Sequence, residues 1–239
     1  MSQDLKSKLV DAALGHVAFD GWSPETFDAA VADSGVDPVV ARAICPRGAV
    51  DLALAFHENG DAAMIAALEG ADLDEMRFRD KVAFAVRKRL ELCPDKEAVR
   101  RGSTLFALPH YAPTGTRLIW GTADAIWNAL GDTSRDFNWY TKRTTLSGVY
   151  AATVLFWLGD ESDGHADTWA FLDRRIENVM QFEKAKGAFQ KSPLGKALER
   201  PLSSLGRMRA PKTASGFPGR WRYSQKKRRD EHERRNARH

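Results

Sequence analysis

Apolar residues at helical spacing, divided by clear start and stop signals, run through most of this chain. The first stripe recurs every four residues and consists of Leu5, Leu9, Ala13 and Val17. Proline directly follows a capping residue at Ser23-Pro24 and again at Asp37-Pro38, as at the start of a helix. No alternating apolar and polar run bounded by turn residues is present, so no strand is predicted. The sequence therefore predicts an all-α fold.

Breaking residues divide the chain into further helices. We expect short helices that end at Gly35 and before Pro46, and a fourth helix that ends at Gly60. Longer helices are expected at about 73–92, 96–108, 116–130, 138–158 and 165–189. The segment 145–158 is apolar nearly all round, but at 1.5 Å per residue it spans only about 21 Å, less than a bilayer core of about 30 Å. We expect it to be the buried centre of a bundle.

Charge is distributed unevenly along the chain. The formal net charge is +4, yet residues 211–239 alone carry ten Lys and Arg against three Asp and Glu, a net of +7. Residues 1–60 hold four basic and nine acidic residues, a net of −5. The basic character thus belongs to the C-terminal segment, and the N-terminal part is acidic.

Catalytic signatures are absent from the sequence. It contains no Gly-rich phosphate loop, no nucleophile elbow, and no paired Cys or His at metal-ligand spacing. The two cysteines, Cys45 and Cys93, cannot form a disulfide framework, which is typical of a reducing compartment. The start of the chain lacks the pattern of a secretion or import signal. We predict a non-enzymatic, cytoplasmic protein with no catalytic residues, no metal and no cofactor.

The order of short helices over residues 9–56 resembles the helix-turn-helix head of TetR-type repressors, and the helices behind it resemble the ligand-binding core of those proteins. Taken alone, this resemblance implies a DNA-binding dimer with a small-molecule pocket. A recognition helix must offer cations to phosphates and polar groups to base edges. The equivalent segment, 37–45, offers Arg42 and otherwise mainly apolar side chains within an acidic head. We therefore predict a degenerate helix-turn-helix, with a TetR-type ligand-responsive transcriptional regulator as the alternative function.

A more specific resemblance comes from the run GDTSRDFNWYTKRTTLSGVYAATVLFWLGDESDGHADTWAFLDRRIENVM (131–180), with LFALPH (105–110) and DAIW (124–127) upstream. These motifs resemble the coenzyme Q biosynthesis accessory family of TetR-like lipid-binding proteins. The resemblance implies a homodimer without specific DNA binding, which binds polyprenyl quinone intermediates or phospholipid. It also implies presentation of the quinone to a membrane-associated demethoxyubiquinone hydroxylase. Because the family's mitochondrial presequence is not found, we expect a bacterial member that is peripheral at the inner face of the membrane.

Three sets of site residues follow. The residues expected to line the lipid pocket are Leu105, Phe106, Leu118, Trp120, Ile126, Trp127, Val149, Leu155, Phe156 and Trp169. From sequence alone, such bulky side chains could equally be ordinary core. The resemblance assigns partner binding to Trp139 and Tyr140, and adjacent helical residues diverge by about 100°, so at least one of the two is expected at the surface. The residues expected to bind the membrane are Leu194, Leu198, Leu202 and Leu205.

Four regions complete the expected organisation. Residues 1–60 form the degenerate helix-turn-helix head, and residues 61–190 form the helical lipid-binding core. Residues 191–210 are expected to form an amphipathic helix that interacts with the membrane, because leucines at helical spacing alternate with Lys and Arg. Residues 211–239 form a basic tail whose composition is typical of disorder.

Overall fold

The computed structural model describes residues 2–191, and the side chains of residues 3–181. Over this range the chain forms the α-helices α1 to α9 and one short 3-10 helix, η1, and no strand occurs among these residues. The all-α prediction is confirmed. The expected membrane helix 191–210, with its four leucines, and the basic segment 211–239 lie outside the described residues, apart from Lys191 at the end of α9.

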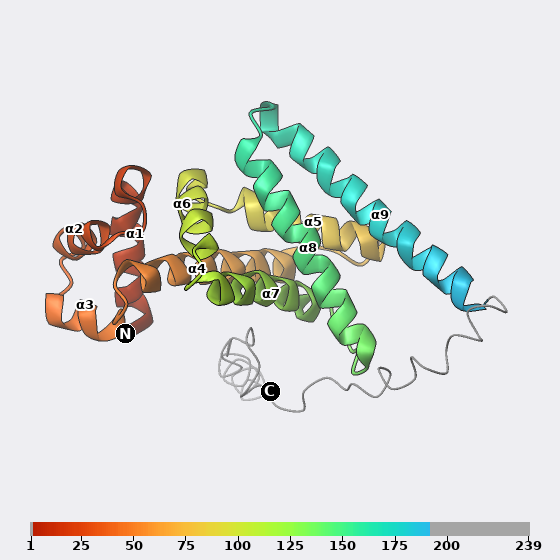
Figure 1. Ribbon diagram of the computed structural model, residues 1–239, viewed down its shortest axis with the longest axis horizontal. Coiled ribbons are helices and arrows are strands. Elements are labelled where there is room, and N and C mark those ends of the chain that lie inside the picture. Colours follow the sequence, from red (N-terminus) through yellow and green to blue (C-terminus); the bar gives the residue numbers. More distant parts are fainter. Residues whose placement is uncertain (1, 192–239) are drawn as a thin grey trace, which may run out of the picture.

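The N-terminal head contains α1 (Ser2–Asp20), α2 (Pro24–Ser34), α3 (Pro38–Ile44) and the first turns of α4 (Ala49–Gly70). Both predicted caps are present. The hydroxyl of Ser23 accepts a hydrogen bond from the Thr26 amide at 3.2 Å. The Asp37 carboxylate accepts hydrogen bonds from the backbone amides of Val39 and Val40, at 2.9 and 3.1 Å. Figure 1 shows α1, α2 and α3 gathered at one end of the molecule, with α4 leading from them into the body.

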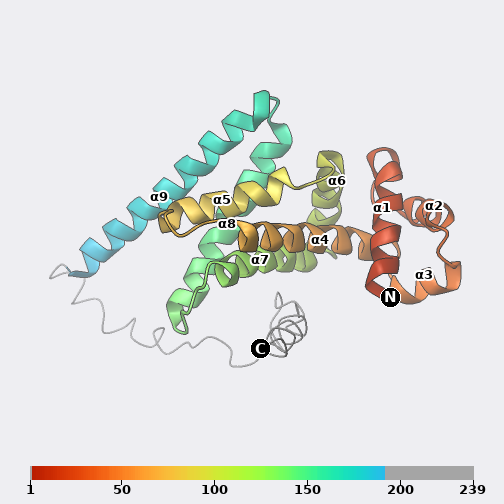
Figure 2. The same ribbon diagram turned by 180° about the vertical axis from the view of Figure 1, so that it is seen from behind.

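The body is built from α4 and the remaining helices: α5 (Phe78–Glu91), α6 (Lys96–Ala107), α7 (Ala112–Ala129), α8 (Phe137–Gly159), η1 (Asp163–His165) and α9 (Ala166–Lys191). Helix α8 packs mainly against α7 and α9. Figure 2, seen from behind, shows α8 crossing α5 and passing the ends of α4 and α7, while α9 returns along the outside of the molecule.

Two separate apolar cores hold these helices together. The head core joins α1 to α4 around Leu9, Val17 and Leu52, each of which is fully buried. The body core joins α4, α5, α7, α8 and α9 around Met64, Val86 and Ile126, which are also fully buried. Because α4 supplies residues to both cores, it fixes the head to the body.

Helix α4 continues to Gly70, so the prediction that it ends at Gly60 was wrong. Gly60 lies inside the helix, and its missing side chain leaves room for Arg89. A Cβ placed at this position would be 2.5 Å from Nη1 of that arginine. Helix α5 starts at Phe78 rather than near residue 73, because the chain first turns. In that turn the Asp72 carboxylate accepts a hydrogen bond from the Asp74 amide at 3.3 Å.

The central apolar segment is only partly buried, contrary to our prediction. Trp157 and Leu158 are buried, but Leu155 is 66% exposed and Phe156 is 37% exposed. The reason is that α8 packs mainly against α7 and α9, and Leu155 lies on a side of the helix that the described residues leave largely uncovered. Within this part of the chain, no helix combines the length and apolarity needed to cross a bilayer.

Candidate functional site

The connection between α7 and α8 carries a dense set of polar and aromatic contacts. Gly131 begins the turn with a positive φ of 79°, a conformation that suits glycine. Asp136 ends the turn as the N-cap of α8, because its carboxylate accepts a hydrogen bond from the Asn138 amide at 3.0 Å. The turn therefore sets the angle between the two helices, and the motif FNWYTKR occupies the first two turns of α8.

Arg143 is the central residue of this hairpin and is almost completely buried. Its Nε donates to the Asp124 carboxylate at 2.5 Å, and its Nη1 donates to the Asp132 carboxylate at 3.0 Å. Its Nη2 donates to the side-chain oxygen of Asn128 at 3.2 Å. A buried guanidinium is tolerated when its hydrogen-bonding capacity is met in this way. Arg143 thus ties α8 to both α7 and the turn.

Lys142 forms a second link beside Arg143. Its ammonium group lies 2.8 Å from the Asp132 carboxylate, 2.6 Å from the Ser134 hydroxyl and 4.9 Å from the centroid of the Trp127 ring. Burial by itself raises the pKa of Asp132, but hydrogen bonds from Lys142, Ser134 and Arg143 outweigh burial and hold that pKa well below its usual range. Asp132 is therefore ionised at neutral pH.

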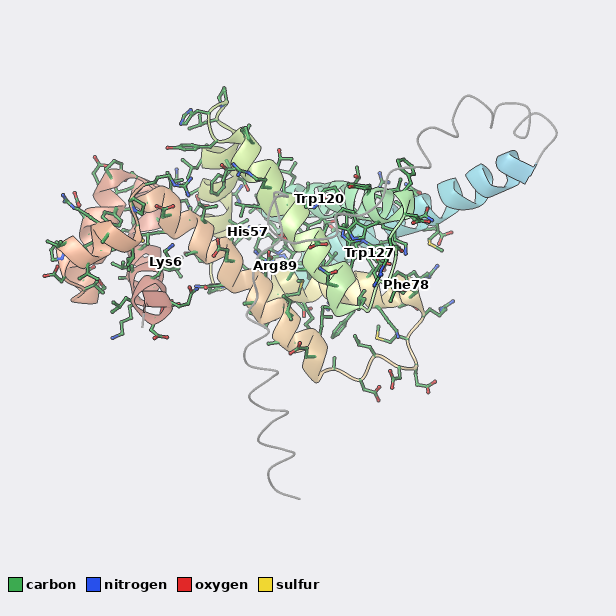
Figure 3. All side chains as sticks on the ribbon, turned by 90° about the horizontal axis from the view of Figure 1, so that it is seen from below. Lys6, His57, Phe78, Arg89, Trp120 and Trp127 are labelled. Atoms are coloured by element: carbon green, nitrogen blue, oxygen red, sulfur yellow. The ribbon has the colours of Figure 1, made fainter. Side chains whose placement is uncertain are left out.

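Aromatic rings cover this polar framework, and we call Phe78, Trp120, Trp127, Trp139 and Tyr140 the hairpin cluster. Trp139 is only 5% exposed and lies between Trp120, at a centroid distance of 6.0 Å, and Tyr140, at 4.8 Å. Trp120 and Tyr140 are half-buried. The exposed Phe78 ring stacks on Trp127 at 5.2 Å, and Figure 3 shows these two side chains together at one end of the body.

The expectation that Trp139 or Tyr140 reaches the surface is met by Tyr140, which is half-buried, whereas Trp139 is buried. The two rings diverge because they are adjacent on a helix. Trp139 points to the inside of the hairpin, where the Arg143 guanidinium lies 4.1 Å from its ring centroid. An interaction of this kind, between a cation and an aromatic face, fixes the ring in place.

A second polar cluster lies deep in the body, where α4, α5 and α7 meet. Nε of Arg89 donates to the Asp61 carboxylate at 2.7 Å, and Nη2 of Arg89 donates to the His57 carbonyl at 3.0 Å. Thr122 Oγ1 lies 3.0 Å from both Asp61 oxygens and 2.9 Å from Nε2 of His57. Figure 3 shows His57 and Arg89 near the middle of the molecule.

Burial sets the protonation of this inner cluster. It lowers the pKa of His57 to about 4, so the imidazole is neutral at neutral pH. It also raises the pKa of Tyr150 to about 12, so the phenol stays protonated. The polar groups of Asp61 and Arg89 are engaged with their neighbours. The hydrogen bonds of the inner cluster thus link α4, α5 and α7. In the described part of the chain, no group of three or more His, Cys, Asp or Glu side chains is placed to hold a metal ion.

The residues predicted to line the lipid pocket do not gather in one place. Ile126 and Val149 belong to the body core, and Trp127 and Trp169 pack against it. Leu105 and Phe106 pack instead against the head core. Leu118 is buried on α7, and Trp120 belongs to the hairpin cluster. Leu155 and Phe156 lie at the surface. The structure therefore brings four of the ten residues together at the body core.

The exposed residues of α8 form an apolar edge with α9. Phe156 stacks on Phe171 with ring centroids 4.5 Å apart and planes 12° apart, and the Arg175 guanidinium lies 5.2 Å from the Phe171 ring. Leu155, next to Phe156, is the most exposed large apolar side chain of α8. We call Leu155, Phe156 and Phe171 the α8–α9 edge. Exposed large apolar side chains on one pair of helices make this edge a candidate interaction site.

Comparisons with known proteins show which proteins this chain is similar to. Residues 112–183 match the COQ9 family model. The Ubiquinone biosynthesis protein COQ9, mitochondrial, of Drosophila melanogaster is 34% identical over 184 residues, which cover 75% of this chain and 56% of that protein. The human protein of the same name is 31% identical over 186 residues, which cover 74% of this chain and 58% of that protein. The chain is a homologue of the COQ9 proteins.

A relative in Dictyostelium discoideum, the Probable ubiquinone biosynthesis protein coq9, mitochondrial, is 29% identical over 198 residues, which cover 79% of this COQ9 homologue and 64% of the relative. This chain thus spans less than two thirds of the length of these three relatives. The family match covers α7 and α8 and most of α9. All members of the hairpin cluster except Phe78 lie within it.

The solved structure of another protein has the same fold. The TetR transcriptional regulator from Nitrosomonas europaea matches with a TM-score of 0.62 at 19% identity, over 74% of this COQ9 homologue and 99% of the regulator. The expected TetR-like fold is therefore confirmed, and at this identity the likeness concerns the fold alone.

The charged residues that organise the site of this COQ9 homologue were not predicted from its sequence. Arg143 and Asp124 are buried partners, yet neither stands out within its motif. Asp61 and Arg89 were missed as well. One signal was available: Asp124 stands inside the otherwise apolar and small run GTADAIW, where a buried charge needs a partner. The identity of that partner depends on how the helices pack.

Proposed function

We propose that this chain is an accessory protein of ubiquinone biosynthesis, which binds polyprenyl quinone intermediates and presents them to a membrane-associated hydroxylase of the demethoxyubiquinone type. The observation that carries the proposal is the position of the family match, because residues 112–183 contain the α7–α8 hairpin with its aromatic cluster. The curated relatives are named as proteins of ubiquinone biosynthesis.

The physical need for such a protein lies in the solubility of the substrate. Each buried CH₂ of a polyprenyl tail gains about 0.8 kcal/mol in an apolar environment, so the quinone stays in the membrane. A protein with an apolar interior lowers the barrier to extraction. In this chain, Trp127, Trp169 and the buried Ile126 and Val149 supply large apolar surfaces at the body core. These residues are our candidates for contact with the lipid.

The hairpin cluster is our candidate for the surface that binds the hydroxylase. Tyr140 and Trp120 are half-buried rings supported from behind by Trp139. Trp139 is itself held by Arg143. Rigid aromatic side chains that are partly exposed are favoured anchors of protein interfaces, because little conformational entropy is lost when they bind.

In this proposal the hydroxylase performs the chemistry and this chain contributes binding. The most deeply buried ionisable groups support that division, since Asp61 and Arg89 pair with each other, as do Asp124 and Arg143. Engaged in this way, they hold helices together. The proposal further places residues 191–210 against the membrane, with the protein peripheral at the cytoplasmic side.

The α8–α9 edge is our candidate for the contact between two copies of the chain. Leu155 is 66% exposed, and a Cβ placed at Gly148 or Gly159, seven residues before it and four after it on α8, would meet no atom within 4 Å. Glycines at this spacing remove the side chains that would hold a second helix away, so they suit its close approach. Sedimentation analysis of Leu155→Glu is expected to show monomers, whereas Leu155→Met is expected to keep the dimer.

Two measurements test the proposed function. Native mass spectrometry of the purified protein is expected to detect a co-purifying isoprenoid quinone or phospholipid. A pull-down with the hydroxylase is expected to succeed with the wild type and to fail with Tyr140→Ala, while Thr144→Ala, at an exposed position one turn further along α8, serves as the matched control. Protein that carries no lipid and does not bind the hydroxylase would exclude the proposal.

The TetR-like fold raises a second function, that of a DNA-binding regulator, and helix α3 argues against it. Its one arginine, Arg42, lies 3.4 Å from the Asp28 carboxylate, and Val39 and Val40 are exposed. A mobility-shift assay with random duplexes is expected to show only binding that weakens steeply with salt, due to the basic segment 211–239. Selection of a particular duplex sequence would instead support the regulator.

A further inference from the structure

The outer face of α3 is apolar and largely uncovered by the described residues. Val39 is 77% exposed and Val40 is 39% exposed, and the exposed Ala43 lies one turn further along the same side. The opposite side of the helix is fixed by Ala41, which is completely buried in the head core. We call Val39, Val40 and Ala43 the α3 face. In a helix-turn-helix this is the side that is free to meet another molecule.

Negative charge accompanies the α3 face. Glu25 and Asp28 lie one turn apart on α2 and are exposed, and Asp37 caps the start of α3 with an exposed carboxylate. Two of the nearby positive charges are paired with carboxylates. Arg42 lies 3.4 Å from Asp28, and Arg47 lies 2.6 Å from the buried Asp51. The face is thus an apolar surface with an acidic rim, which repels phosphates and favours a cationic partner.

The chain itself contains a segment of complementary chemistry. Residues 211–239 carry ten Lys and Arg against three Asp and Glu. Three aromatic residues, Phe217, Trp221 and Tyr223, stand among these cations. Apolar rings suit the α3 face and the cations suit its rim. The 19 residues of 192–210 separate this segment from the end of α9, and they can span up to about 65 Å when extended.

We propose that the α3 face is a docking site for the chain's own basic segment 211–239. The docked segment covers Val39 and Val40 with its aromatic residues, while its lysines and arginines lie against Glu25, Asp28 and Asp37. Docking would occupy the lysines and arginines of the basic segment. The α3 face would therefore compete with anionic lipid or nucleic acid for these cations. The α3 face would then bind a cationic segment, where the corresponding face of a DNA-binding helix-turn-helix binds anionic DNA.

Zero-length carbodiimide cross-linking of the full-length protein, followed by mass spectrometry, tests this proposal, because the reagent joins lysines to carboxylates in direct contact. We expect Lys226 and Lys227 to be linked to Glu25, Asp28 or Asp37. The exposed acidic residues of the turn before α5, Asp72, Asp74 and Glu75, provide an internal control for attraction by charge alone. Equal yields at the head and at this turn would overturn the proposal.

A matched pair of variants tests the apolar part. The double variant Val39→Ser, Val40→Ser keeps every charge, and both side chains are exposed, so the fold should persist. We expect the cross-links to the head to fall at least about tenfold, equivalent to about 1.4 kcal/mol. Phe19→Ser, at a residue of α1 that is 83% exposed, should leave them unchanged. Unchanged yields in the double variant would also overturn the proposal.

Mixing unlabelled protein with ¹⁵N-labelled protein before cross-linking identifies which copy supplies the segment. Cross-links between peptides of the same label alone assign docking within one copy, and mixed labels assign docking between copies. Both results support the proposed occupant. Cross-links from Lys226 and Lys227 that avoid the head altogether would exclude it.

Discussion

The guanidinium of Arg143 lies 4.1 Å from the ring centroid of Trp139, while its nitrogen atoms bond Asp124, Asp132 and Asn128. One buried cation therefore fixes an aromatic ring and two acidic side chains at once. Because Trp139 is held from the inside, its neighbour Tyr140 is the ring of the motif NWY that lies toward the surface. This relationship gives Trp139 a structural role and leaves Tyr140 as the ring to which we assign partner binding in our proposal.

Substitution of these two residues is expected to have different effects. Trp139→Ala removes a buried ring and leaves Arg143 uncovered, so we expect the free energy of unfolding to fall by about 3–5 kcal/mol. Tyr140→Ala should lower it far less, yet weaken binding of the hydroxylase by about 2 kcal/mol or more. Thermal unfolding and a binding titration measure the two quantities. Equal loss of stability in both variants would contradict this assignment.

Asp132 gives a prediction that depends on pH. Its pKa is lowered in the folded state, so its contribution to stability is complete above the unfolded pKa near 4 and is lost as the pH falls below that value. Asp132→Asn should therefore lower the free energy of unfolding by about 1–3 kcal/mol at pH 7. The difference from the wild type should shrink below about pH 4. Denaturant titrations across this range measure it, with Asp74→Asn in an exposed turn as the control.

Gly60 tests the inner polar cluster. A Cβ at this position would lie 2.5 Å from Nη1 of Arg89, so Gly60→Ala should displace the guanidinium from Asp61 and destabilise the protein. The matched control is Gly15→Ala in α1, where a Cβ meets nothing within 4 Å. That substitution should raise stability by up to about 1 kcal/mol, because alanine favours helix. Thermal unfolding of the two variants should shift in opposite directions, and a shared direction would contradict the role of Gly60.

Glu58 is expected to limit stability at neutral pH. Burial raises its pKa to about 7, with Lys6 opposing this rise and Asp61 and Asp51 adding to it. Since the folded state disfavours the charged form, the cost of ionisation grows as the pH rises from about 4.5 to 7 and stays constant above. Glu58→Gln should therefore raise the melting temperature at pH 8 and have little effect at pH 4. A lower melting temperature of Glu58→Gln at pH 8 would show instead that the ionised carboxylate stabilises the folded state.

Local signals in the sequence predicted much of this architecture. Ser23 and Asp37 cap their helices as expected, because a cap needs only its own side chain and the next few amides. The same reasoning failed at Gly60. A glycine is commonly a stop signal for a helix, but this one makes room for Arg89, 29 residues away and on another helix. Long-range packing decided that position.

The sequence by itself determined the class of fold, the helix boundaries that depend on caps and prolines, and the family motifs of residues 131–180. These features are local or are recorded directly in the order of residues. Only the tertiary structure decided that Trp139 is buried and Leu155 exposed, and that Arg143 bonds Asp124. Helical periodicity shows which residues share a face, but the burial of that face depends on which helices pack against it, and contacts between distant segments set that choice.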